Sequence, residues 1–72
     1  MTENLSAATA IAHAAISAAG FTPSTHAADS FVSSRTGELH AFSAESVGVG
    51  IQRSPAFHVV VKIATGEIVR AF

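Results

Sequence analysis

The side chains best suited to binding a metal ion in this sequence are four histidines: His13, His26, His40 and His58. No two of them are three or four residues apart on a predicted helix, or two apart on one predicted strand, so none forms a local pair of ligands. Because the chain has no cysteine, a zinc site would need imidazoles or carboxylates from distant segments. The sequence therefore predicts no metal site.

The residue types used in catalysis are present, but not in a catalytic pattern. Serine, histidine and aspartate all occur, but the one aspartate is Asp29 and no serine stands in the glycine-flanked pattern of a nucleophile elbow. The glutamates of the predicted sheet fall in or beside separate turns, so no carboxylate pair for acid–base catalysis is indicated. A sheet this small also has little room to enclose a pocket of several hundred Å³. We expect no enzyme activity and no cofactor.

Two stretches of small residues are candidate contact surfaces. Four alanines share one flank of the predicted N-terminal helix: Ala7, Ala10, Ala14 and Ala18. They would let a second helix or sheet approach closely, unless alanine is present for its helix propensity alone. Gly48 and Gly50 would form a smooth platform on a strand, unless they only give the sheet a twist or a bulge. As a nucleotide-binding motif this pair is incomplete, because it lacks the third glycine.

The elements that must position these residues follow from the pattern of the chain. Residues 3–19 lack proline and glycine, are rich in alanine and end before Gly20, which predicts one helix with a glycine cap. Its predicted core face holds Leu5, Ala8, Ile11, Ala12, Ala15, Ile16 and Ala19. Residues 20–29 contain Pro23 and short polar residues, which predicts a loop. Alternating apolar and polar residues then predict five strands, at 30–35, 38–44, 47–53, 56–63 and 67–72.

The tripeptide Thr-Gly-Glu occurs twice, at residues 36–38 and 65–67. We interpret both copies as turns of β-hairpins, because glycine supplies the positive φ that a tight turn needs. An even loop would pair Phe31 with Phe42, and Ile63 with Ile68. The sequence leaves open whether Leu39 or His40 of the second strand points to the core.

The predicted fold is α+β, with one N-terminal helix packed on a five-stranded antiparallel β-meander (residues 30–72) in a single domain spanning residues 1–72. One helix covers only one face of such a sheet. The other face is predicted to be flat and mostly uncharged, and to present Gly48, Gly50, Gln52, His58, Val60, Lys62, Val69 and Ala71.

Charged residues are scarce: only 12% of the 72 residues are Asp, Glu, Lys or Arg, compared with about 25% in an ordinary soluble domain. Since 49% are apolar, either short neutral residues form the exterior or another molecule covers part of it. The net charge of −1 and the dispersed cations argue against nucleic-acid binding. The alanine-rich N-terminal stretch has no basic start like that of a signal peptide and is too weakly hydrophobic to span a membrane.

These observations favour a small, non-catalytic, cytoplasmic protein that binds a protein partner stoichiometrically, as a homo-oligomer or with a different protein. Small inhibitors of host systems from phages and mobile elements, including anti-CRISPR proteins, act in this way. The alternative is an oligomeric carrier of a small ligand, with a pocket between subunits and with His58 and Lys62 as polar contacts. The predicted contact residues are the four alanines of the helix, Gly48 and Gly50, and the trio His58, Val60 and Lys62.

Overall fold

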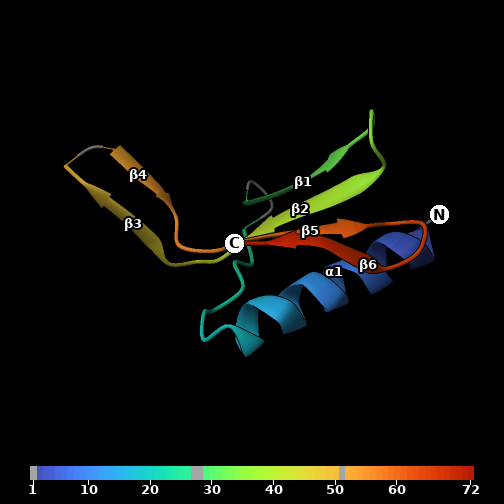
Figure 1. The fold of residues 1–72 in the computed structure, drawn as a ribbon, viewed down its shortest axis with the longest axis horizontal. Coiled ribbons are helices and arrows are strands. Elements are labelled where there is room, and N and C mark those ends of the chain that lie inside the picture. The colour runs from blue at the N-terminus through green and yellow to red at the C-terminus, as the bar shows by residue number, and fades with distance from the viewer. Residues whose placement is uncertain (1, 27–28, 51) are drawn as a thin grey trace.

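A computed structural model describes residues 2–26, 29–50 and 52–72 of the chain (Figure 1). One helix precedes the strands along the sequence, and the elements are α1 (Thr2–Ala18), β1 (Ser30–Ser33), β2 (Glu38–Phe42), β3 (Ser46–Val49), β4 (Gln52–Pro55), β5 (His58–Lys62) and β6 (Glu67–Ala71). Four of the strands form an antiparallel sheet in the order β1-β2-β5-β6, and α1 packs on one face of it. The predicted α+β fold class is confirmed.

The helix ends in the glycine cap that its sequence predicts. Gly20 has a φ of 92°, and its N–H donates to the carbonyl of Ser17 at 3.0 Å. The N–H of Phe21 donates to the carbonyl of Ile16 at 3.1 Å. These two bonds form a Schellman motif, which satisfies carbonyl groups that the end of a helix leaves free. Among the described residues, no helix has the length and hydrophobicity needed to cross a membrane.

The core lies between α1 and the two central strands. Ala8, Ala12 and Ile16 of the helix are fully buried, as predicted, against Leu39, Ala41, Val59 and Val61 of the sheet. The two alanines let the helix backbone come close to the sheet, because they carry only a methyl group. At the ends of the predicted core face, Leu5 and Ala19 are exposed, so the buried stripe is shorter than predicted.

The predicted third strand, residues 47–53, is wrong in its placement. The chain instead reverses between Val49 and Gln52, where Gly50 has a φ of 65°, and β3 and β4 form a separate two-stranded sheet. This β3–β4 hairpin projects away from the helix and the main sheet (Figure 1). Its removal from the main sheet makes β2 and β5 direct neighbours, with His40 opposite Val60.

Both Thr-Gly-Glu copies close β-hairpins, as predicted, but the predicted pairing across them is wrong. The loops span residues 34–37 and 63–66, and each ends in a glycine with positive φ, 69° at Gly37 and 75° at Gly66. Each of these glycines donates its N–H to the carbonyl four residues earlier, at 2.8 and 2.7 Å. Because these loops have four residues, Phe31 pairs with His40 rather than with Phe42. In the second hairpin, Val61 takes the place predicted for Ile63 opposite Ile68.

Candidate functional site

The face of the four-stranded sheet that α1 leaves uncovered, here called the open face, is the candidate site. Along β2, Leu39 and Ala41 are buried against the helix, so His40 and Phe42 point to the open face. Leu39 rather than His40 therefore points to the core, a question that the sequence left open. The open face carries Phe31, Glu38, His40, Phe42, His58, Val60, Lys62, Glu67, Arg70 and Phe72.

Five aromatic rings form a continuous row across this face, here called the ring cluster. Phe31 stacks on His40 with centroids 4.6 Å apart, and Phe42 stacks on His58 at 4.4 Å. The ring of Phe72 meets His58 edge-on at 4.9 Å. The two ends of the cluster remain accessible, because Phe31 is 52% and Phe72 is 62% exposed. Phe31 and His40 cover one face of each other, as do Phe42 and His58, so these stacked faces are closed to a ligand.

The middle of the ring cluster is a hydrogen bond between two histidines. Nδ1 of His40 and Nε2 of His58 are 3.0 Å apart, while the ring centroids are 5.2 Å apart. The centroid distance exceeds the nitrogen–nitrogen distance by about the sum of two imidazole ring radii, so both nitrogens lie close to the line between the ring centres. The lone pair of one nitrogen therefore points at the N–H of the other. A metal ion bound by both nitrogens would need both lone pairs to converge on a point beside that line.

This hydrogen bond fixes what the pair offers to a ligand. If His40 donates from Nδ1, its Nε2 is an acceptor, and Nδ1 of His58 carries the other N–H; the reverse tautomer exchanges the two roles. The neutral pair thus presents one donor and one acceptor through its outer nitrogens. Within the described part of the chain, no buried polar side-chain atom lacks a hydrogen-bond partner, so any unpaired outer nitrogen reaches solvent.

Protonation of His58 is opposed by its surroundings. Burial lowers the pKa of His58 below its usual range, and the neighbouring imidazole of His40 lowers it further. A proton added to the pair would turn both outer nitrogens into donors, and a second would set two N–H groups against each other across the 3.0 Å gap. We therefore take His58 as neutral at neutral pH.

Charged side chains border the ring cluster, two of each sign: Glu38, Lys62, Glu67 and Arg70. They come from three adjacent strands, and Lys62 lies directly opposite both Glu38 and Glu67. The open face is therefore neutral in sum, with charges of both signs available to a partner.

A shallow pocket of about 150 Å³ lies at the centre of the open face, over β5. Its lining combines the two histidines with Glu38, Val60, Val69, Arg70 and Phe72. Val60 is only 4% exposed, although it points away from the helix, because these side chains surround it. Pockets for drug-sized ligands measure about 300–1,000 Å³, so this pocket alone holds only part of such a molecule.

The structure brings together one of the three predicted contact groups. His58, Val60 and Lys62 all lie on the open face, with Val69 beside them. Gly48 and Gly50 lie in the projecting β3–β4 hairpin instead, because the predicted third strand leaves the sheet. Ala71 pairs with the buried Val59 and so faces the helix side, also contrary to prediction. Gln52 belongs to β4 and is likewise outside the main sheet.

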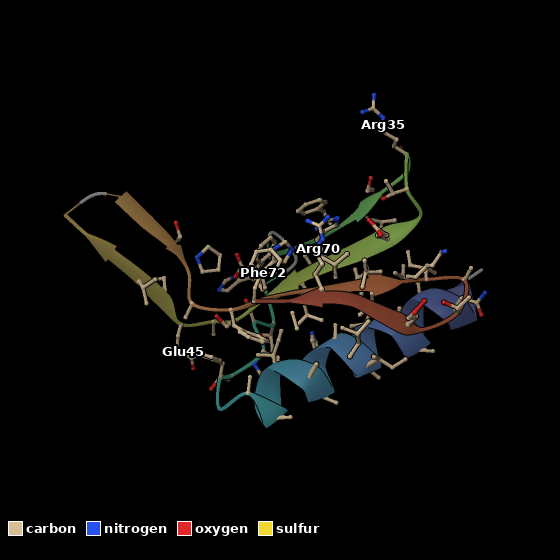
Figure 2. All side chains as sticks on the ribbon, viewed as in Figure 1. Arg35, Glu45, Arg70 and Phe72 are labelled. Atoms are coloured by element: carbon tan, nitrogen blue, oxygen red, sulfur yellow. The ribbon has the colours of Figure 1, made fainter. Side chains whose placement is uncertain are left out.

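The four alanines of the helix, Ala7, Ala10, Ala14 and Ala18, are all exposed. They belong to α1, which packs on the face of the sheet opposite the ring cluster; Figure 1 shows the helix on one side of the sheet. Their role as a contact surface stays a prediction. Figure 2 shows the contrast between the two sides, with Arg70 and Phe72 on the side of the sheet away from the helix.

Of the ring cluster, the sequence predicts only His58 as a contact residue. The predicted third strand would lie between the strands of His40 and His58, so the sequence predicts no contact between these two side chains. The spacing of two residues between His40 and Phe42 is the signal that places both on one face, once the facing of β2 is known. Among the described residues, no three metal-binding side chains gather in one place.

A second feature fixes the loop after the helix. The N–H of Thr22 donates to both carboxylate oxygens of Glu45, at 3.1 and 2.9 Å, and these bonds lower the pKa of Glu45. The N–H of Ala44 returns a bond to the carbonyl of Thr22 at 2.7 Å. Together these hydrogen bonds hold the loop against the end of β2, where the β3–β4 hairpin begins; Glu45 is labelled there in Figure 2.

In comparisons with known proteins, no family model, no curated protein and no solved structure matches this chain.

Proposed function

We propose that this protein is a small, non-catalytic binding module that acts by stoichiometric contact with a protein, and that the open face is its docking surface. The observation that carries the proposal is the ring cluster, which runs from β1 to the residue after β6 and ends in two phenylalanines that are 52% and 62% exposed. Aromatic residues and arginine are enriched at the centres of protein interfaces, and arginine is enriched among the residues that dominate binding energy.

The chemistry of the open face favours a protein over other ligands. A nucleic-acid surface of this kind needs exposed ring faces interleaved with basic residues. Here four of the five rings are stacked in pairs, and the border carries as many carboxylates as cations. A protein surface, in contrast, offers apolar side chains for the exposed rings and groups of both signs for the border.

A stoichiometric inhibitor is one role that fits such a module, including the inhibitors of host systems that phages and mobile elements encode. An inhibitor of this type needs a firm surface and no catalytic group. The open face supplies the surface from strands that are held by backbone hydrogen bonds rather than from a loop.

The second candidate function is a carrier for a small ligand, and the central pocket favours it. One pocket of about 150 Å³ is too small, but two of them facing each other would reach about 300 Å³, the lower end of the usual range. His40, His58, Glu38 and Arg70 would then supply the polar contacts. Native mass spectrometry of the purified protein separates the two functions, because a carrier retains a ligand of defined mass.

A photo-crosslinking experiment tests the docking surface. The full chain is expressed with p-benzoylphenylalanine in place of Phe72, and in a matched control with the same group in place of Ala14 on the exposed side of the helix. We expect covalent adducts with protein from position 72 and few from position 14. Adducts from position 14 alone, or from neither position, would refute the open face as the docking surface.

A further inference from the structure

Two opposite charges flank the central strand β5 on the open face. Glu38 lies on β2 and Arg70 on β6, and both line the central pocket. Glu38 lies directly opposite Lys62 of β5, whereas Arg70 lies opposite the uncharged Val60. No carboxylate stands opposite Arg70 on β5, so a carboxylate from outside the chain can meet it.

This arrangement is self-complementary under two-fold symmetry. In a two-fold contact the same patch meets itself, so that residue i touches residue j of the other copy and j touches i. An axis lying over the pocket, between β2 and β6, would place Glu38 of each copy on Arg70 of the other.

The exposed area of the single chain is large for its mass. The accessible surface is 4838 Å² for a chain of 7.3 kDa, whereas a compact monomer of that mass exposes about 4200 Å². The excess is roughly 650 Å², which approaches the ~800 Å² that each partner buries in a standard interface. Part of it comes from the β3–β4 hairpin, whose Val47 is 61% exposed. A two-stranded hairpin alone is marginally stable in water, so it too gains from a neighbour.

We infer that the protein seated on the open face is a second copy of this chain, bound face to face about a two-fold axis, with reciprocal Glu38–Arg70 ion pairs around the ring cluster. This inference rests on the proposed function, because it names the partner of the same surface. The rings of Phe31 and Phe72 lie at the two ends of the cluster and are covered in the dimer. A chain of 72 residues without disulfides gains the buried area that it lacks alone.

Charge reversal tests the reciprocal pairing. The mass of the full chain in solution is measured by light scattering or sedimentation for the wild type, for Glu38→Arg and for Arg70→Glu. We expect the wild type to have twice the chain mass. Each variant should dissociate at least ~100-fold more readily, since like charges set against each other in an interface are strongly unfavourable. An equimolar mixture of the two variants should regain the dimer, because each mixed pair again joins Arg with Glu.

The matched control is Arg35→Glu, which makes the same charge change at the tip of the β1–β2 turn, away from the ring cluster (Figure 2). It should leave the dimer intact. Circular dichroism checks that every variant is folded. Should either reversal unfold the chain, Glu38→Gln and Arg70→Gln remove the pairing without repulsion, and should weaken the dimer about 10-fold.

Three results would overturn the inference. A wild type that stays monomeric at millimolar concentration would show that the partner is a different protein; crosslinks from position 72 to that protein would leave the proposed function standing. Single variants that remain dimeric would place the dimer contact elsewhere. Variants that are monomeric alone and stay monomeric when mixed would exclude the reciprocal pair of Glu38 and Arg70.

Discussion

The two Thr-Gly-Glu turns provide a matched pair of substitutions, Gly37→Ala and Gly66→Ala. Both glycines end a four-residue hairpin loop and have nearly the same φ, 69° and 75°. They differ in surroundings: a methyl group added at Gly37 meets nothing within 4 Å, whereas one added at Gly66 would lie 3.0 Å from Cδ1 of Ile11 on the helix. The pair therefore separates backbone strain from packing of the second turn on α1.

The magnitudes follow from these two terms. Forcing alanine into the left-handed region costs about 1–2 kcal/mol, and the reduced freedom of the unfolded chain returns about 0.4–1 kcal/mol. We expect Gly37→Ala to lower the free energy of unfolding by about 1 kcal/mol. Gly66→Ala should cost a further ~0.5–1.5 kcal/mol, because Cδ1 of Ile11, packed beside the core, must move by a few tenths of an ångström and so twist its side chain away from a staggered angle.

Urea and thermal unfolding followed by circular dichroism measure both variants at one protein concentration, which is held fixed because association shifts apparent stability. Each kcal/mol should lower Tm by about 4–8 °C in a domain of this size. Equal losses in the two variants would refute the packing of the second turn on the helix. No loss in Gly37→Ala would refute the left-handed glycine itself.

Three further predictions concern titration, the loop and the helix. The folded state lowers the pKa of His58 below the unfolded value of 6.5, so the unfolded chain binds more protons than the folded chain at mildly acidic pH. The contribution of His58 to the free energy of unfolding is therefore complete above pH 6.5 and is lost as the pH falls through the folded pKa. His58→Gln should flatten this dependence in urea titrations between pH 7 and 5, and an unchanged slope would contradict the assignment. Glu45→Gln should speed hydrogen exchange at the Thr22 amide, measured by NMR, because the neutral amide accepts more weakly than the carboxylate; unchanged protection would mean that the carboxylate is not needed. Ala14→Glu should change neither the circular dichroism nor the mass in solution. A variant that became monomeric would instead place the dimer contact on the alanines of the helix.

The local elements of this fold were predictable from the sequence because their signals are local. A run of alanine that ends at Gly20 specifies a helix and its cap within a few residues. Alternating residues and the glycine turns specify hairpins in the same way. The exact pairing was not predictable, since loops of two and four residues both suit Thr-Gly-Glu and shift every cross-strand partner.

The site was less accessible to sequence reasoning, because it depends on which strands are neighbours. Residues 47–53 alternate like a strand, but the positive φ of Gly50 turns the chain back and takes the hairpin out of the sheet. Only then do β2 and β5 pair, which brings His40 to His58. His58, Val60 and Lys62 were placed on the uncovered face correctly, because that step needed only the alternation along one strand.

The central claim is that another copy of the chain covers the open face, and the five phenylalanines test it in a single spectrum. The wild type is labelled with fluorophenylalanine, and the broadening of each ¹⁹F resonance by a soluble paramagnetic agent is measured. Phe21 and Phe57 stack on each other beside the core, at 5.3 Å, and serve as internal references. If the open face is covered, Phe31 and Phe72 broaden no more than these references. If they broaden most, as their exposure of 52% and 62% in the single chain requires, the open face is free and the account is wrong.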